Sequence, residues 1–457
     1  MSRLDVVILA AGQGKRMYSS LPKVLHSLAG KPLVQHVLDT ARTLNPAQTV
    51  IVYGHGGDQV QSTLAAQASL AWAHQAQQLG TGHALAQALP QLSGDVTLML
   101  YGDVPLTRPA TLAALLGEAE GGKLGILTVT LDNPTGYGRI VRNAAGQVQS
   151  IVEQKDADAA QAAIKEINTG ILALPTARLA GWLSELRNDN AQGEYYATDL
   201  IALAVRDGVE VVTTQPAHAW EAEGINNKVQ LAQLERIHQQ NVAHGLLLAG
   251  VTLVDPARID VRGTLQHGQD VSVDINCVFE GDVQLGNNVQ IGAHCFLRNV
   301  RIADGVVIQP YSHLQDAVVG ANAQIGPYAR LRPGAELAAD VHIGNFVEVK
   351  NAQIGVGSKV NHLSYIGDAE IGTQTNIGAG TITCNYDGVN KHKTIIGNEV
   401  RIGSNASLVA PVTIGDRATT GAGSVISRNA PAGELTIARA RQVTVPGWQR
   451  PEKPAKK

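Results

Sequence analysis

The chain has 457 residues, of which 44% are hydrophobic and 16% are charged, and its formal net charge is −3. The slightly negative charge excludes a general nucleic-acid-binding surface, and the length is too great for one hydrophobic core, so two or three domains are expected. The tail from Arg450 to Lys457 is locally basic and is expected to be disordered.

The cysteines and the N-terminal apolar run indicate where in the cell the protein is located. Cys277, Cys295 and Cys384 are widely spaced and form no Cys-x-x-Cys pair, which argues against a disulfide framework and against a zinc site. The apolar run Val6–Ala11 is too short to span a membrane and leads directly into a glycine-rich loop. A buried strand, a cytoplasmic location and no membrane partner are therefore predicted.

Residues 1–228 alternate short apolar runs with helical patterns, which is typical of an α/β domain with a mostly parallel sheet covered by helices on both faces. The clearest predicted strands and helices are Val6–Leu9, Thr49–Tyr53, Thr97–Tyr101 and Ile126–Leu131, and Pro32–Leu44 and Ala110–Ala119. Residues 229–249 lack proline and space their apolar residues at helical intervals, so we expect a linker helix there. The predicted domains are thus 1–228 and 250–457, joined by this helix.

The loop after the first predicted strand is rich in glycine and positive charge. It reads Gly12-Gln13-Gly14-Lys15-Arg16, and Pro22-Lys23 follows. Glycines let backbone N–H groups approach phosphate oxygens closely. The loop is neither a Walker A motif nor a complete dinucleotide fingerprint, so alone it indicates phosphate binding only weakly. Asp103, just after the Thr97–Tyr101 strand, lies where α/β sheets bind ligands, although an aspartate there is more often a cap.

From Leu285 onward, an aliphatic residue or a threonine falls at every sixth position, and most third steps are shortened to five. Hexapeptide repeats of this kind predict a parallel β-helix, and the shortened third step indicates three sides of similar length. One inward residue per side would fill the axis of such a prism. The inward residues are Leu285, Ile291, Leu297, Ile302, Ile308, Leu314, Val319, Ile325, Leu331, Leu337, Ile343, Val349, Ile354, Val360, Ile366, Ile371, Ile377, Thr383, Ile396, Ile402, Leu408, Ile414, Thr420 and Ile426.

The step from Thr383 to Ile396 is 13 residues and predicts a loop that leaves the prism at Asn385–Lys393. The coils near this loop carry polar side chains that a purely structural β-helix does not need. Because neighbouring coils stack about 4.8 Å apart, these side chains can converge on one outer edge. They are Arg332, Lys350, His362, Tyr365, Asn376, Asn385 and Tyr386.

Several motifs of the first domain resemble those of sugar-phosphate nucleotidyltransferases. They are Leu9-Ala10-Ala11-Gly12-x-Gly14-x-Arg16-Met17 with Pro22-Lys23, Gln75 with Leu79-Gly80-Thr81-Gly82-His83, Tyr101-Gly102-Asp103-Val104-Pro105-Leu106, Gly136-Tyr137-Gly138-Arg139-Ile140, Asn168-Thr169-Gly170 and Glu223-Gly224-Ile225-Asn226-Asn227. Lys15 departs from the family, in which a threonine is common there. Joined to a hexapeptide prism, the chain resembles the bifunctional bacterial enzymes that acetylate glucosamine-1-phosphate and then uridylylate the product.

The resemblance implies a Rossmann-like nucleotidyltransferase domain that transfers UMP from UTP to N-acetylglucosamine-1-phosphate and releases pyrophosphate. It implies Asp103 and Asn226 as Mg²⁺ ligands, and Arg16 and Lys23 as catalytic residues that balance phosphate charge. The implied contacts to nucleotide and sugar are Leu9, Ala10, Ala11, Gly12, Lys23, Gln75, Gly80, Thr81, Tyr101, Asp103, Gly138, Glu153, Asn168 and Asn226.

For the second domain the resemblance implies a left-handed parallel β-helix that transfers the acetyl group of acetyl-CoA. An amine nucleophile needs a base with a pKa near 7, which suits histidine, but spacing alone does not choose among His342, His362 and His392. The resemblance selects His362. It also implies Arg332, Lys350, Tyr365 and Asn376 at glucosamine phosphate, and Ala379, Asn385, Tyr386, Ser404, Ala422 and Arg439 at acetyl-CoA.

The resemblance further implies a homotrimer whose acetyl sites are shared between neighbours. Two other readings are a sugar nucleotidyltransferase with one activity, in which the prism is a scaffold, and a regulatory subunit without activity. His362 with Arg332 and Lys350 argues against an enzyme with one activity. Arg16, Lys23 and Asp103 argue against a regulatory subunit without activity.

Overall fold

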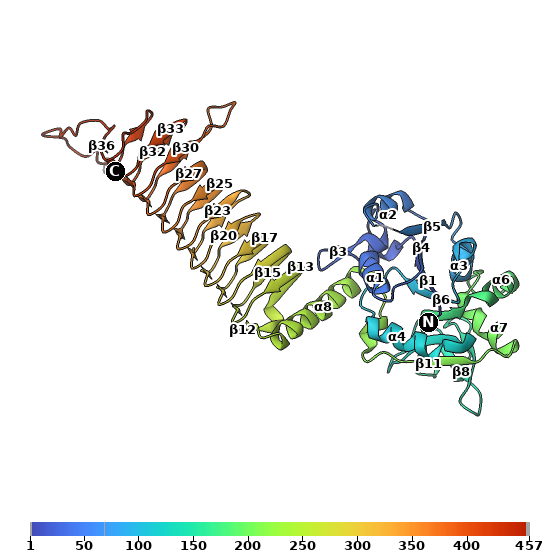
Figure 1. The fold of residues 1–457 in the computed structure, drawn as a ribbon. Coiled ribbons are helices and arrows are strands. Elements are labelled where there is room, and N and C mark those ends of the chain that lie inside the picture. The colour runs from blue at the N-terminus through green and yellow to red at the C-terminus, as the bar shows by residue number, and fades with distance from the viewer. Residues whose placement is uncertain (1, 68, 454–457) are drawn as a thin grey trace. The chain divides into compact units, whose positions relative to one another are not determined.

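The computed structural model describes residues 2–67 and 69–453, and the chain forms two compact units, Met1–Gln240 and Asn241–Lys457 (Figure 1). Residues 454–457, which belong to the tail expected to be disordered, lie outside the described residues. None of the helices in the described ranges is long and apolar enough to cross a bilayer.

The first unit is built on a mostly parallel sheet, as predicted. Within its described residues the main path of the sheet has the order β11–β7–β10–β6–β1–β4–β5, and the β8–β9 hairpin pairs with β10. All four predicted strands are present, and along the main path described above β10 runs antiparallel to both of its neighbours, β6 and β7. The bounds are β1 Leu4–Ala10, β4 Gln48–Tyr53, β5 Leu70–His74, β6 Val96–Tyr101, β7 Leu124–Thr130, β8 Arg139–Arg142, β9 Val148–Val152, β10 Glu166–Pro175 and β11 Val211–Thr214, with a small separate pair β2 Ser27–Leu28 and β3 Lys31–Pro32.

Helices cover both faces of this sheet. Buried residues of α1 and α4 pack in the core on one face, and those of α3, α6 and α7 pack in the core on the other. This two-layer burial explains why the central strands are almost continuously apolar. The helices are α1 Leu33–Arg42, α2 Gly57–Thr63, α3 Thr81–Ala88, α4 Pro109–Glu118, α5 Ala159–Ala162, α6 Thr176–Glu185, α7 Leu200–Arg206 and α8 Lys228–Leu248.

Helix α8 occupies the predicted linker position, and the division between the two units falls inside it. Leu234 in its first half packs with Leu33 in the first unit. Ala243 and Leu246 in its second half close the end of the core of the second unit.

The second unit is a stack of short parallel strands (Figure 1). In its described residues one sheet holds β12 Thr252–Leu253, β14 Ser272–Val273, β16 Gln290–Ile291, β18 Val307–Ile308, β21 Gln324–Ile325, β24 His342–Asn345, β26 Lys359–His362, β28 Asn376–Ile377, β31 Arg401–Ile402, β34 Thr419–Thr420 and β36 Leu435–Thr436. The other sheet holds β13 Ile259–His267, β15 Cys277–Leu285, β17 Phe296–Ile302, β19 His313–Gln315, β20 Val318–Val319, β22 Arg330–Leu331, β23 Ala335–Leu337, β25 Glu348–Ile354, β27 Tyr365–Ile371, β29 Ile382–Cys384, β30 Thr394–Ile396, β32 Ser407–Val409, β33 Val412–Ile414 and β35 Val425–Ile426.

The inward residues predicted from the repeat fill the axis of this stack. Every one of them from Leu285 to Ile426 is buried. Thr383 is accommodated because its hydroxyl donates to Gly367 O at 3.0 Å and accepts from Gly367 N at 2.8 Å. Long strands such as β25 bend and contribute to two sides, which gives the three-sided coil. This architecture fits the left-handed parallel β-helix that the resemblance implies.

Candidate active sites

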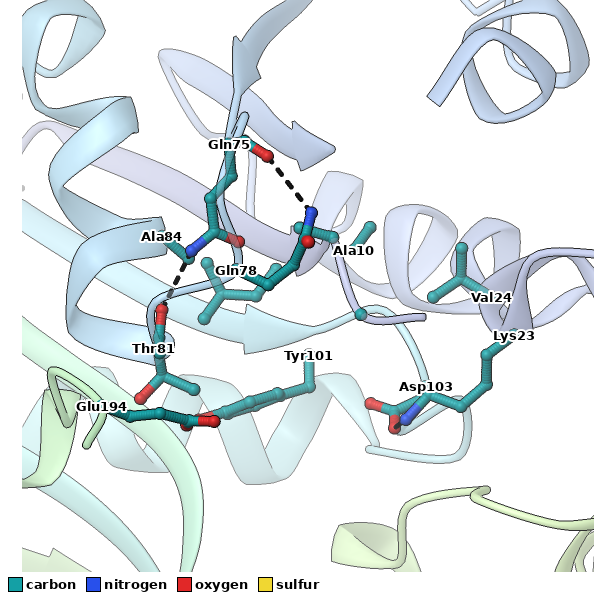
Figure 2. Close-up of a pocket in the computed structure, with 14 residues that line it drawn as sticks. Ala10, Lys23, Val24, Gln75, Gln78, Thr81, Ala84, Tyr101, Asp103 and Glu194 are labelled. Atoms are coloured by element: carbon teal, nitrogen blue, oxygen red, sulfur yellow. Dashed lines mark hydrogen bonds and ion pairs between the residues drawn. The ribbon is translucent and has the colours of Figure 1, made fainter. Parts of the chain in front are cut away.

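A pocket of about 230 Å³ opens at the carboxyl ends of β1, β5 and β6 (Figure 2). Strand β1 lies between β4 and β6, so successive strands are added on opposite sides of it, and ligands of open α/β sheets bind at such switch points. The lining residues are Leu9, Ala10, Ala11, Gly12, Lys23, Val24, Gln75, Gln78, Gly80, Thr81, Ala84, Tyr101, Asp103 and Glu194. The pocket thus gathers ten of the residues predicted to contact nucleotide and sugar.

Positive charge and oxygen ligands meet on one side of the pocket. Lys23 Nζ forms an ion pair with the carboxylate of Asp103 and lies 3.1 Å from Asn226 Oδ1. Arg16 donates to the same Asn226 oxygen at 3.1 Å. Short 3-10 turns at Lys15–Met17 and Lys23–Leu25 carry the two cations, so the glycine loop and the strand that precedes it fix their positions.

The donor set fits Mg²⁺. The Lys23 ammonium already bridges two oxygen atoms, those of Asp103 and Asn226, and hard oxygen atoms are the ligands that Mg²⁺ prefers. Among the described residues no cluster of three or more His, Cys, Asp or Glu residues could hold a metal by itself. Substrate phosphates would therefore have to complete the coordination, as they commonly do for Mg²⁺.

One side of the pocket is shaped by Gly80, which directly precedes helix α3. Its φ of 111° is a conformation that favours glycine, and a Cβ there would lie 2.5 Å from the Tyr195 carbonyl oxygen. Gln75 Nε2 donates to Gly80 O at 3.0 Å, and Thr81 Oγ1 accepts from Ala197 N at 3.0 Å. Figure 2 shows Gln75 and Thr81 on the same side of the pocket, so amide and backbone groups are available to recognise a base.

Gly138, Glu153 and Asn168 lie outside the pocket lining, and the charge of Glu153 acts on Tyr101, which is part of the lining. A Cβ on Gly138 would lie 3.1 Å from Glu153 Oε1, and Asn168 N donates to Gly138 O at 2.8 Å. Burial raises the pKa of Tyr101 above its ordinary value, and the charges of Asp103 and Glu153 add to the effect. Burial also raises the pKa of Glu153. Tyr101 therefore remains a neutral hydroxyl between the predicted phosphate side and the predicted sugar side.

In the second unit, four of the predicted acetyl-transfer residues lie along one corner of the β-helix. His362, Ala379, Ser404 and Ala422 each stand two residues after an inward residue of the first sheet, on successive coils. The backbone links these coils, because Gly380 N donates to His362 O and Asn405 N donates to Ala379 O. Arg439 donates to Ala422 O at 2.7 Å. The line forms an extended strip suited to an elongated ligand.

The predicted phosphate and sugar residues Arg332, Lys350 and Tyr365 belong to the other sheet: Arg332 directly follows β22, Lys350 is on β25 and Tyr365 is on β27. The Tyr365 hydroxyl lies over Gly367, where a Cβ would be only 2.3 Å away. Asn385 Nδ2 lies 3.5 Å from this hydroxyl. Arg332 is paired with Glu348 at 2.7 Å.

The structure separates some of the predicted residues. Asn376 is on β28 and Tyr365 on β27, so they belong to different sheets of the unit. Tyr386 is on the loop and is 62% exposed, and its hydroxyl donates to Gly388 O at 2.6 Å.

Sequence reasoning missed residues in both sites. Gln78 and Glu194 line the pocket of the first unit. In the second unit Asp368 is buried, and its two carboxylate oxygens accept from Asn351, at 2.6 Å, and from Asn385. Burial opposes ionisation of Asp368, but these hydrogen bonds and the charges of Lys350 and Lys391 outweigh it, so the pKa is lowered.

The first unit is an α/β domain whose pocket combines a glycine-rich loop, a lysine and an aspartate, and the second unit is a hexapeptide β-helix. Together they define a nucleotidyltransferase that carries a second transferase unit. Residues 6–190 match the MobA-like NTP transferase domain, residues 261–354 the GMPPB C-terminal domain and residues 393–428 the bacterial transferase hexapeptide (six repeats).

Full-length relatives give the family. The chain is 64% identical over 454 residues to the bifunctional protein GlmU of Chromobacterium violaceum, covering 99% of both chains. It is 61% identical to the bifunctional protein GlmU of Ralstonia nicotianae, covering 99% of this chain and 100% of that one. The chain therefore belongs to the GlmU family of bifunctional proteins, and the predicted resemblance is confirmed.

Proposed function

We propose that the chain makes UDP-N-acetylglucosamine in the cytoplasm by two reactions. The unit Met1–Gln240 transfers UMP from UTP to N-acetylglucosamine-1-phosphate, and the unit Asn241–Lys457 first acetylates glucosamine-1-phosphate with acetyl-CoA. The observation that carries the proposal is the presence of a different polar site on each unit: the Lys23, Asp103 and Asn226 cluster on one, and the His362 corner on the other.

In uridylyl transfer a phosphate oxygen of the sugar attacks the α-phosphorus of UTP, and the bond to the β-phosphate oxygen breaks. Both reactants are anions, so the main requirements are alignment and neutralisation of charge. Arg16 and Lys23 supply fixed positive charge, and the backbone from Leu9 to Gly12 holds the nucleotide. Mg²⁺, held by Asp103 and Asn226, would further neutralise and align the phosphates when bound.

Recognition of the two ends of the product is divided around Tyr101. Gln75, Gly80 and Thr81 bind the uracil with amide and backbone groups. Gly138, Glu153, Asn168 and Asn226 hold the N-acetylglucosamine unit, and the carboxylate oxygens of Glu153 accept hydrogen bonds from sugar hydroxyls.

In acetyl transfer the amine of glucosamine-1-phosphate attacks the thioester carbon. The C–N bond forms, the C–S bond breaks and the amine proton passes to His362, which returns a proton to the CoA sulfur so that CoA leaves as the thiol. Arg332, Lys350, Tyr365 and Asn376 hold the sugar phosphate. The strip Ala379, Ser404, Ala422 and Arg439, with Asn385 and Tyr386, binds acetyl-CoA, and the Ala379 backbone N–H donates to the oxyanion.

A homotrimer is the proposed assembly, as the resemblance implies, and an exposed apolar ladder beside the His362 corner offers a surface for its interface. The rings of His294, Tyr311, Tyr328 and Phe346 are stacked at centroid distances of 4.9, 4.9 and 5.2 Å. Tyr311, Tyr328 and Phe346 are each about half exposed, and Leu363 continues the ladder next to His362. A contiguous apolar strip of this kind is typical of a subunit interface.

One assay tests the function directly. The protein is given glucosamine-1-phosphate, acetyl-CoA, UTP and Mg²⁺, and free thiol and pyrophosphate are measured together. The proposal predicts that both are released. When acetyl-CoA is omitted, pyrophosphate should be released only if N-acetylglucosamine-1-phosphate replaces glucosamine-1-phosphate. Pyrophosphate release from glucose-1-phosphate without thiol release would instead indicate an enzyme with one activity, and release of neither would indicate a subunit without activity.

A further inference from the structure

Asn345 and His362 face each other across one step of the β-helix. Asn345 ends β24 and His362 ends β26, and the two residues are paired in register. Asn345 Oδ1 lies 3.0 Å from His362 Nδ1, and Leu363 N donates to Asn345 O at 3.1 Å. The side-chain and backbone contacts therefore fix both the imidazole ring and the turn that carries it.

The identity of the two atoms decides which ring nitrogen is protonated. A carboxamide oxygen only accepts hydrogen bonds, so a hydrogen bond to Asn345 Oδ1 requires a proton on His362 Nδ1. In a neutral imidazole the other nitrogen, Nε2, then carries the lone pair. A free lone pair is what a general base needs, and the same contact points Nε2 away from β24.

The strands around His362 carry few other groups that could determine which nitrogen of its ring is protonated. Strands β24 and β28 pack on either side of β26 and place Asn345 and Ala379 against the corner. Over these three strands, all of which the structure describes, the titratable side chains besides His362 are His342 and Lys359, each three residues before the corner position. The uncharged amide of Asn345 is thus the direct polar contact of the ring.

We infer that Asn345 is a positioning residue for acetyl transfer: its side-chain oxygen holds His362 in the tautomer that is protonated on Nδ1, so that Nε2 receives the proton of the sugar amine. The inference rests on the proposed role of His362 as base and deepens it. Asn345 itself has no contact with the reacting atoms in this account.

The decisive variants change the charge or remove the acceptor. Asn345→Asp places a carboxylate beside the ring, which favours the imidazolium, so the acid limb of the kcat profile for acetyl transfer should move up by about one pH unit. Asn345→Ala should lower kcat about tenfold while KM for acetyl-CoA stays within about twofold, because the ring loses its preferred tautomer and orientation. Gln324→Glu on β21, two strands from β26, adds the same charge to the same sheet and should leave the profile unchanged.

A readout independent of activity is the ¹⁵N spectrum of histidine-labelled protein, with the His362 signals assigned from their absence in His362→Gln. When its ring is neutral, wild-type His362 should show a protonated Nδ1 and an unprotonated Nε2, and in Asn345→Asp the imidazolium should persist to higher pH than in wild type. A protonated Nε2, or an unshifted pH profile in Asn345→Asp, would overturn the inference. If His362→Gln retains acetyl transfer, His362 is not the base and the proposed function of the second unit is wrong on this point. If His362→Gln loses acetyl transfer while both Asn345 variants behave as wild type, only the positioning role of Asn345 is wrong.

Discussion

Lys23 and Asp103 form an ion pair on one side of the pocket of the first unit, although 80 residues separate them in the sequence. Both side chains are largely buried there, and Asn226 shares the Lys23 ammonium. The pair places a carboxylate and a cation at the proposed phosphate site, so each can exchange its partner for part of the substrate.

Asp103→Asn should lower the rate of uridylyl transfer by at least about 100-fold, because the hard anionic ligand for Mg²⁺ is lost. Acetyl transfer should stay within about twofold of wild type. The check is a Mg²⁺ titration of pyrophosphate release with N-acetylglucosamine-1-phosphate. Normal product formation at every Mg²⁺ concentration would remove Asp103 from the metal site.

Gly170→Ala tests the packing that holds Tyr101. Gly170 has φ of 85°, and a Cβ there would lie 2.4 Å from Tyr101 Cε2. Gly146 has a similar φ of 80° with nothing within 4 Å, so Gly146→Ala carries the backbone strain without the clash. We expect Gly170→Ala to lose about 1–3 kcal/mol more of the free energy of unfolding in urea than Gly146→Ala does, and to raise KM for the sugar phosphate. Equal losses in the two variants would show that the ring moves aside at no cost.

Asp368→Asn tests the buried carboxylate between the coils and the loop. The change leaves Asn351 and Asn385 without a charged acceptor, and hydrogen bonds to charged groups are worth about 1.5–3 kcal/mol. We expect KM for acetyl-CoA to rise about tenfold, because Asn385 and the loop after it lose their anchor. Asp304→Asn, at an exposed turn of the same unit, is the control. An unchanged KM in Asp368→Asn would mean that the loop holds its position without this carboxylate.

The stability of the first unit should fall in mild acid because of His238. Its ring lies 5.6 Å from that of His36, and burial, with the His36 charge, lowers its pKa from 6.5 to about 4. The unfolded chain therefore binds this proton more readily, so stability is full above pH 6.5 and is lost as the pH falls toward 4. At pH 5 the loss is at most about 2 kcal/mol relative to neutral pH.

His238→Gln removes this titration, so the difference in unfolding free energy between pH 7 and pH 5 should become smaller than in wild type. Chemical denaturation at the two pH values measures it. The same pH difference in variant and wild type would assign the acid sensitivity to other groups.

The sequence predicts most of the fold because the relevant patterns are local. One inward residue per side produces the hexapeptide period, and all the positions named from it are buried. Apolar runs bounded by turns identify β1, β4, β6 and β7. The antiparallel placement of β10 between β6 and β7 has no such signal, because strand direction within a sheet depends on long connections rather than on residue pattern.

Some contacts of the candidate sites could be predicted from the sequence, and others could not. Asn345 and His362 are 17 residues apart, and so are Asn351 and Asp368, and Asp368 and Asn385. Seventeen residues make one coil with two steps of six and one of five, so polar residues at this separation stack directly and could have been paired from the period. Glu194 offers no comparable signal, because it reaches the pocket through a loop that is held by backbone hydrogen bonds from Tyr195 N to Leu79 O and from Gly82 N to Tyr195 O.

The central claim is that one chain carries two independent active sites. The direct measurement is UDP-N-acetylglucosamine formed from glucosamine-1-phosphate, acetyl-CoA and UTP by Asp103→Asn, by His362→Ala, and by an equal mixture of both. The account predicts almost no product from either variant alone, thiol release without pyrophosphate from the first, and restored synthesis by the mixture. Loss of both half-reactions in either single variant, with no synthesis by the mixture, would contradict it.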